Sequence, residues 1–207
     1  MRRDLTPERR LRSGRLRAVL AGGLVLGVGT TATLAAWTDE EHATETFTAG
    51  TFSIVGSTNG ADFSDHPSMP GAALNFTVTP TAMAPGTTVY ALYSVKTTVA
   101  SVGGSVRLMA DDPGNRSGLG AYLEYGVTTI AGITCNAGAF SAGTPVVATE
   151  SKLTTGAAAK NTLAASGASP INYCFAVTLP TIAPNEAQGA ELTARWTFAA
   201  TTDPAGP

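Results

Sequence analysis

The sequence predicts an all-β protein: an antiparallel β-sandwich with one long insertion, preceded by a signal-peptide helix. Two observations support the sandwich, namely six runs of alternating apolar and polar residues and turn-forming Pro and Gly residues between those runs. A basic and then apolar amino terminus supports the preceding helix. At 207 residues, the chain holds one ordinary domain once a targeting segment is removed.

The first predicted element is a signal peptide over residues 1–35. Basic residues precede an uncharged run from Ala18 to Trp37, and small residues close that run, as is typical of secretory signals. About 20 uncharged residues can also span a bilayer as an uncleaved anchor. Seven Gly and Thr residues make this run weakly apolar, which favours cleavage. Twin-arginine export fits less well, because Arg9-Arg10 lacks the usual aromatic-leucine continuation.

Residues 51–200 form the predicted sandwich domain, and residues 201–207 form a short polar tail. Side chains alternate between the two faces of a strand, so each run places its apolar members on one face. Those members are Leu74, Phe76 and Val78; Val89, Ala91, Tyr93, Val95 and Val99; Val106, Leu108 and Ala110; Leu123, Tyr125 and Val127; Tyr173, Phe175, Val177 and Leu179; and Leu192, Ala194, Trp196 and Phe198. Strands with one buried and one wet face predict two packed antiparallel sheets.

Residues 136–170 are rich in Ala, Gly, Ser and Thr, and we expect a long insertion with at most one short helix, over residues 156–165. Cys135 and Cys174 bracket this insertion, and an even pair of cysteines predicts a disulfide in an oxidising compartment. The disulfide would close a loop of 40 residues, which stabilises a fold by about 4 kcal/mol. Cys174 has the opposite parity to Phe175, so the two should occupy opposite faces of a strand.

Charge is divided unevenly along the chain. Seven of the 13 basic residues lie among the first 17 residues, beside two acidic ones. From Ala36 onward, 6 basic residues face 13 acidic ones, a difference of −7. An acidic body disfavours nucleic acid and anionic membrane surfaces as partners.

The sequence shows no arrangement typical of a catalytic, cofactor-binding or metal-binding site. The two histidines, His42 and His66, lie in polar stretches, and neither fits the H-E-x-x-H pattern of zinc proteases. No Gly-x-Ser-x-Gly elbow is present to indicate a serine hydrolase. We therefore expect no catalytic residues, no cofactor and no metal ligands.

Three polar stretches are better interpreted as solvated surface than as ligand sites. Residues 111–115 offer oxygen atoms to calcium but lack the spaced acidic series of a calcium loop, which favours a hydrated turn. Asp62, Asp65 and His66 are typical of an exposed loop, and Glu41 with His42 of an exposed pair.

The junction after the apolar run resembles that of the alternate, SipW-type signal peptides. There, small residues precede an Ala-aromatic-x-Asp pattern, an acidic stretch and a Thr-Phe-x-Ala-Gly-Thr motif. The matching positions here are Ala36, Trp37, Asp39, Thr46, Phe47, Ala49, Gly50, Thr51 and Phe52. This signature is that of the TasA and camelysin family of exported proteins, and the Arg and Ala content looks like that of an actinobacterial member. Weaker similarities near residues 84–105 and 188–198 extend the resemblance to both ends of the mature chain.

The resemblance implies that a SipW-type signal peptidase cuts between Ala35 and Ala36, leaving no permanent membrane span. It also implies an exported, non-enzymatic jelly-roll protein that is secreted or associated with the cell envelope. Fibre subunits of the family, found in biofilm matrix, assemble when the freed N-terminal segment adds as a strand to the next subunit. The partner would be another copy of this chain or a companion surface subunit.

The segment available for such strand addition is residues 36–50. Its assembly residues would be Ala36, Trp37, Asp39, Phe47, Ala49 and Gly50, with Trp37 as the apolar anchor. Phe47 and Phe52 differ in parity, so the inward face switches near Gly50, and we expect the first fixed strand from about Thr51.

Two other classes of function stay open. Some camelysin relatives are described as proteases, so a secreted peptidase is the first alternative. The second is a surface-binding, adhesive module for a glycan or a host protein, which exposed aromatic residues on a sheet face would favour.

Overall fold

The computed structural model describes residues 39–76 and 83–202. The chain divides into two units, residues 1–47 and 48–207. In the first unit, the described residues 39–47 form no helix or strand and are all exposed. The predicted signal peptide, its cleavage site at Ala35 and Ala36, and the anchor Trp37 lie outside the described residues.

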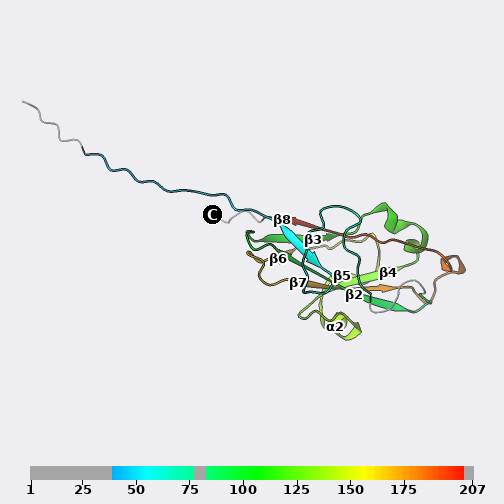
Figure 1. Ribbon diagram of the computed structural model, residues 1–207. Coiled ribbons are helices and arrows are strands. Elements are labelled where there is room, and N and C mark those ends of the chain that lie inside the picture. The colour runs from blue at the N-terminus through cyan, green and yellow to red at the C-terminus, as the bar shows by residue number, and fades with distance from the viewer. Residues whose placement is uncertain (1–38, 77–82, 203–207) are drawn as a thin grey trace, which may run out of the picture. The chain divides into compact units, whose positions relative to one another are not determined.

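The larger sheet of the second unit has five antiparallel strands in the order β1-β2-β7-β4-β5 (Figure 1). Their bounds are β1 (Ile54–Ser57), β2 (Thr88–Thr97), β4 (Glu124–Ile130), β5 (Thr144–Lys152) and β7 (Ile171–Thr178). The central strand β7 pairs with β2 from Ile171 opposite Val95 to Thr178 opposite Thr88. The β-branched and aromatic residues that dominate β2, β4 and β7 suit a pleated, buried surface.

The smaller sheet has three antiparallel strands in the order β6-β3-β8. Their bounds are β3 (Gly104–Met109), β6 (Asn161–Leu163) and β8 (Thr197–Thr201). β3 and β8 pair from Ser105 opposite Thr201 to Met109 opposite Thr197. Because Thr201 belongs to β8, the polar tail begins after the boundary expected from the sequence.

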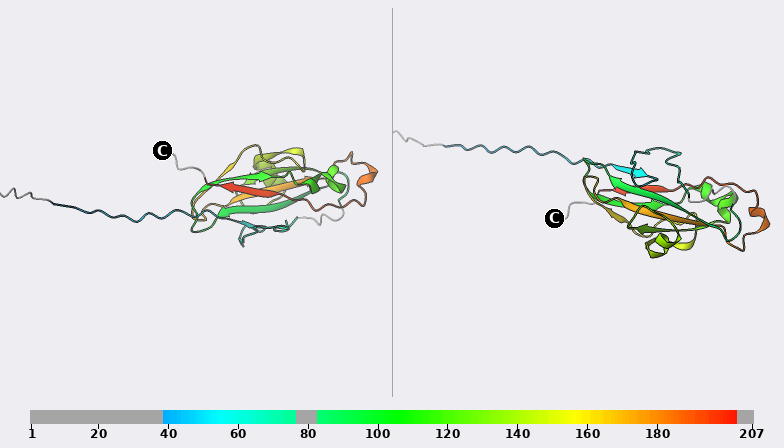
Figure 2. Two further views of the ribbon diagram at one scale, coloured as in Figure 1. Left: turned by 90° about the horizontal axis from the view of Figure 1, so that it is seen from above. Right: turned by 60° about the horizontal axis from the view of Figure 1, so that its bottom comes forward.

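Side chains of the two sheets share one apolar core. The ring of Phe198 on β8 lies 5.0 Å from that of Tyr93 on β2 and 4.9 Å from that of Tyr173 on β7. Tyr173 and Phe175 are completely buried, as is Val106 on β3. The two views of Figure 2 show the strands of both sheets running along the same length of the unit. The all-β prediction is therefore confirmed.

A second, smaller cluster lies on the other face of β7. It contains Leu92, Cys135 and Cys174, with the half-buried Phe140 of helix α2 (Ala137–Ala142) packed against it. The cysteine sulfur atoms are 1.98 Å apart, which is the pairing that the sequence predicts. Cys174 and Phe175 lie in separate clusters, as their opposite parity requires.

The prediction of a long insertion over residues 136–170 is wrong. This stretch contains α2, β5 and β6, and the helix expected over residues 156–165 is instead a turn followed by β6. A few buried apolar residues anchor it to the core: Val147, Leu153, Ala157 and Leu163 are each at most 4 % exposed. Both strands lie at sheet edges, where most side chains stay exposed, so the expected alternation never appears.

Other strand boundaries differ from the predictions. Val99 lies beyond the end of β2 and is 83 % exposed. Thr51 forms only an isolated bridge to Ser101, and the first strand begins at Ile54. Phe76 likewise forms a single bridge, to Ala91, and the rest of that predicted strand lies outside the described residues. Residues 192–196 keep their alternation, but β8 begins only at Thr197.

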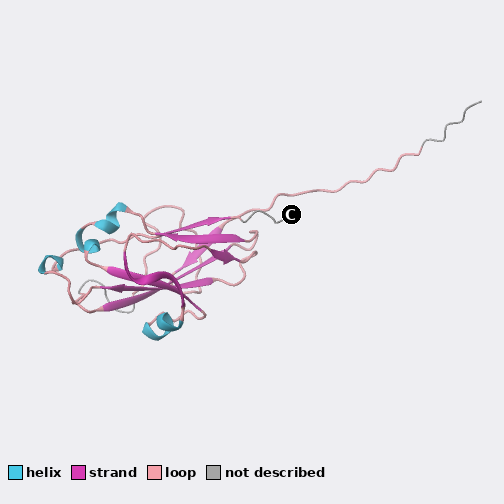
Figure 3. Ribbon diagram, turned by 180° about the vertical axis from the view of Figure 1, so that it is seen from behind, coloured by secondary structure: helices cyan, strands magenta, loops and turns pink. Residues whose placement is uncertain are grey.

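Short helical turns occupy the connections between strands (Figure 3). The 3-10 helices in the described part of the chain are η2 (Pro113–Arg116), η3 (Gly118–Ala121) and η4 (Asn185–Ala187). Asp112 caps the N-terminus of η2, and its carboxylate accepts a hydrogen bond from the backbone N–H of Gly114.

Candidate functional site

An apolar cavity of about 630 Å³ opens between the two sheets and is the candidate site of this molecule. Its walls come from β1, β2 and β7, from the loop after β1 and from the chain leading into β8. Prominent lining residues are Ile54, Leu74, Phe76, Met83, Val89, Tyr93, Val95, Leu123, Phe175, Val177, Leu192, Trp196 and Phe198. Among the described lining residues, Asp65 is the one acidic residue and Arg195 the one Lys or Arg. A site of this composition suits an apolar guest with few charges.

The chain leading into β8, residues 191–196, is here named the closing segment. Its even-numbered side chains are half-buried and its odd-numbered ones are exposed, so the chain is extended as in a strand. Among the described residues, no strand pairs with Leu192, Ala194 or Trp196, because β3, the partner of β8, ends at Met109. Their side chains stay partly exposed.

Asn115 holds the closing segment in place. Its side-chain nitrogen donates to the carbonyl oxygen of Arg195 at 2.7 Å, and its side-chain oxygen accepts from the backbone N–H of Arg195 at 2.9 Å. The same nitrogen lies 3.2 Å from the carbonyl oxygens of Ala110 and Leu153. Asn115 is 1 % exposed. The stretch interpreted as a hydrated turn thus contains a buried junction residue, and sequence reasoning missed it.

Three tyrosines, Tyr93, Tyr125 and Tyr173, line the cavity or lie in the apolar core beside it. The hydroxyl of Tyr125 donates to the carbonyl oxygen of Thr155, and burial raises the pKa of Tyr125 to about 12. Burial also raises the pKa of Tyr173 and the pKa of Tyr93. The hydroxyl of Tyr173 lies 3.1 Å from the side-chain oxygen of Asn161. All three are neutral near pH 7, so they act as packing groups.

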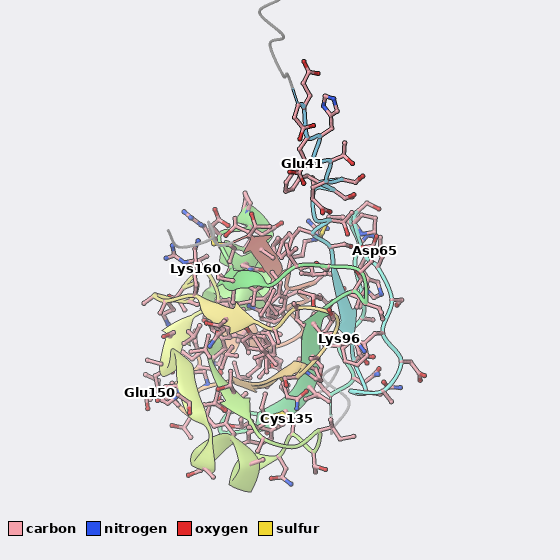
Figure 4. All side chains as sticks on the ribbon, turned by 90° about the vertical axis from the view of Figure 1, so that its left-hand side faces the viewer. Glu41, Asp65, Lys96, Cys135, Glu150 and Lys160 are labelled. Atoms are coloured by element: carbon pink, nitrogen blue, oxygen red, sulfur yellow. A yellow bond between two sulfur atoms is a disulfide. The ribbon has the colours of Figure 1, made fainter. Side chains whose placement is uncertain are left out.

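The titratable residues considered from the sequence do not converge. His42 lies 3.8 Å from Glu40 in an exposed pair of the first unit. His66 contacts the Ser64 hydroxyl at 3.2 Å, and Asp62 accepts a hydrogen bond from Asn59. Figure 4 shows Asp65, Lys96, Glu150 and Lys160 spread around the outside of the second unit. The described part of the chain contains no group of three His, Cys, Asp or Glu residues arranged to hold a metal ion.

The described members of the predicted assembly segment are all exposed. Asp39, Ala49 and Gly50 are exposed and lie outside any helix or strand, and Phe47 is 90 % exposed. Gly50 is required by close packing, because a Cβ there would collide with the side chain of Val102. The backbone N–H of Val102 donates to the carbonyl oxygen of Thr51 at 2.9 Å, which fixes the chain just after Gly50.

Neither the protein-family models nor the curated proteins contain a match to this chain. Within residues 39–76 and 83–202, none of the helices has the length and apolar character needed to cross a membrane. The functional conclusion therefore depends on the residues themselves.

Proposed function

We propose that this chain is an exported, non-enzymatic structural protein of the cell surface, related to TasA and camelysin. Its subunits assemble with each other, or with a companion subunit, when a freed N-terminal segment adds as a strand to a neighbour. The second unit is, in this proposal, a β-sandwich of the jelly-roll type. Support for that architecture comes from two antiparallel sheets that share one apolar core.

The observation that carries the proposal is the state of residues 39–47. They lie within the junction motif, yet they form no helix or strand and every one is exposed. A segment with no helix or strand of its own and with an exposed Phe47 suits pairing with the open edge of another sheet. Strand addition would satisfy its backbone N–H and C=O groups.

Export is supported by two further features. A basic and then apolar leader precedes the junction motif. The buried pair of Cys135 and Cys174 is bonded, which suits an oxidising environment outside the cytoplasm.

The test is to purify the protein beginning at Ala36 and to examine it by electron microscopy and analytical sizing over a range of concentrations. We expect ordered multimers or fibres that grow with concentration, either alone or with a co-expressed companion. The matched control is the uncleaved precursor, in which Ala36 is not a free terminus and assembly should fail. A strictly monomeric protein at high concentration, with and without partners, would contradict the proposal.

The same preparation separates this function from the peptidase alternative. Incubation with an unfolded protein substrate should release no peptides. Peptide release that a chelator abolishes would instead favour the camelysin-like protease.

The adhesive alternative gains no support from exposed aromatic residues, because Phe47 is the one large aromatic residue among the strongly exposed apolar side chains described.

A further inference from the structure

We propose that Asn59 and Gly60, in the loop that follows β1, form a self-modifying site. The side-chain carbon of Asn59 is attacked by the backbone nitrogen of Gly60, ammonia leaves, and water opens the resulting succinimide to aspartate or isoaspartate. Ser57, the last residue of β1, relays the proton in this reaction, and Asp62 holds the leaving nitrogen. The inference does not depend on the proposed function, because it concerns one loop of the second unit.

The Asn-Gly pair favours this ring closure. The ring forms when the backbone nitrogen of the next residue approaches the side-chain carbon of an asparagine, and a Cβ on that next residue obstructs the approach. Gly60 has no Cβ, and its φ of 74° lies in the left-handed region that glycine adopts without steric cost. The other six asparagines of the sequence are each followed by a residue with a side chain.

Three hydrogen bonds polarise the side-chain carbonyl of Asn59. Its oxygen accepts from the Ser57 hydroxyl at 2.8 Å and from the backbone N–H groups of Ala61 and Asp62, each at 2.9 Å. Donors placed around a carbonyl oxygen stabilise the negative charge that develops there when a nucleophile attacks the carbonyl carbon. The loop therefore supplies Asn59 with an oxyanion hole made largely from its own backbone.

The Ser57 hydroxyl connects the nucleophile to that carbonyl oxygen. Its Oγ accepts from the backbone N–H of Gly60 at 3.0 Å and from that of Asn59 at 3.3 Å. The same Oγ donates its own proton to Oδ1 of Asn59. As the Gly60 nitrogen bonds to Cγ of Asn59, its proton passes to Oγ, and the hydroxyl proton passes to Oδ1. Ser57 is 2 % exposed, so little water competes for these hydrogen bonds.

Asp62 holds the leaving nitrogen, because Nδ2 of Asn59 donates to Oδ2 of Asp62 at 2.7 Å. When the tetrahedral intermediate collapses, the proton on Oδ1 returns through solvent to Nδ2, and the Cγ–Nδ2 bond breaks to release ammonia. The Asp62 carboxylate stabilises the positive charge that this nitrogen carries before it leaves. Both side chains are exposed, so water reaches the succinimide. The net reaction converts asparagine and water to aspartate and ammonia.

The product would fit this turn poorly. An aspartate at position 59 has no N–H to donate to Asp62, so two carboxylates would face each other. An isoaspartate also lengthens the main chain by one methylene. Two backbone hydrogen bonds of 3.0 Å between Gly56 and Ser64 close the loop, and residues 65–71 after it line the apolar cavity. Conversion should therefore loosen the loop that leads into one wall of the cavity.

The first experiment incubates the purified full-length protein, folded in buffer or unfolded in urea, at one mildly alkaline pH and one temperature. Peptide mass spectrometry follows the change from amide to acid at residue 59 and separates aspartate from isoaspartate. We expect residue 59 to convert several-fold faster in the folded protein, because only the folded loop aligns the relay and the oxyanion hole. Equal or slower conversion in the folded protein would overturn the inference, since the loop would then protect the Asn-Gly pair.

Variants test the two assigned side chains. Ser57→Ala should slow conversion of residue 59 several-fold in the folded protein and leave the rate in urea unchanged. Ser64→Ala is the matched control, because the Ser64 hydroxyl lies on the same loop but contacts His66, and it should convert at the parent's rate. Asp62→Asn should also slow conversion, since an amide carries no charge to stabilise the leaving nitrogen. Unchanged or faster conversion in a folded Ser57→Ala would overturn the relay. If that variant does not fold, the comparison of folded and unfolded parent decides.

Discussion

The side chain of Asn115 pairs with the backbone of the closing segment at a position where a β-strand would otherwise lie. A carboxamide carries one donor and one acceptor group in nearly the arrangement of a peptide bond, so it can pair with both backbone groups of Arg195. The β3 strand has ended at Met109, so the closing segment is held by Asn115 and by the backbone N–H of Leu119, which donates to the carbonyl oxygen of Glu191 at 3.3 Å. Asn115 is therefore the buried side chain that fixes the chain at Arg195.

Asn115→Ala should lower the free energy of unfolding by about 2–4 kcal/mol, because it leaves several buried backbone groups without partners. Urea unfolding followed by circular dichroism measures this loss. Asn136→Ala is the matched control, since Asn136 caps α2 through one exposed hydrogen bond and should cost about 1 kcal/mol. Equal losses in the two variants would contradict the role assigned to Asn115.

Tyr125 makes the fold sensitive to alkali. Its pKa in the folded state is about 12, above the value of 10.0 for an exposed tyrosine. The folded state therefore keeps this proton at a pH where the unfolded chain has lost it. The free energy of unfolding should be independent of this group below about pH 10 and should fall as the pH rises from about 10 to about 12.

Urea unfolding at about pH 9 and about pH 11 measures that fall, and tyrosinate absorbance reports the ionisation itself. In Tyr125→Phe the group is absent, so the fall should be smaller. An unchanged pH dependence in that variant would show that other groups cause it.

At the scale of elements, the alternation of apolar and polar residues in β2, β3, β4 and β7 could be predicted. Each of these strands has a buried face and a neighbouring strand on both sides. β5 and β6 could not, since edge strands keep polar and small residues exposed and show no clear period. The closing segment shows the converse, because its residues alternate and yet pair with no strand among the described residues. Asn115 escaped prediction because its partners Leu153 and Arg195 are 38 and 80 residues away in the sequence.

The disulfide joins β7 to the connection that precedes α2. Replacing both cysteines, as Cys135→Ala with Cys174→Ala, should lower the free energy of unfolding by about 2–5 kcal/mol. Thermal unfolding of the variant and of the parent, each with and without a reductant, measures this effect. Cys174 is fully buried and Cys135 is 6 % exposed, so a reductant should act on the parent only as it unfolds. Rapid reduction of the folded parent would contradict that packing.

At the scale of the whole molecule, folding and assembly should depend on different residues. Trp37→Ala should leave the unfolding midpoint of the monomer nearly unchanged and weaken assembly, because Trp37 serves a neighbouring subunit in the proposed function. Sizing and thermal unfolding of the protein beginning at Ala36 measure the two effects, with Thr38→Ala as the control. A monomer that unfolds on losing Trp37 would place the segment in its own core and end the strand-addition hypothesis.

The buried position of Asn115 also affects how the protein can be produced. Asn115-Arg116-Ser117 has the Asn-x-Ser form that eukaryotic secretory pathways glycosylate. In the folded chain this amide is enclosed and bonded to backbone groups, so no sugar can be attached there. A host that modifies chains during translocation reaches the same amide before folding, and the attached glycan would then prevent the closing segment from docking. Folding must therefore precede modification at Asn115 for such a host to yield the native closing segment.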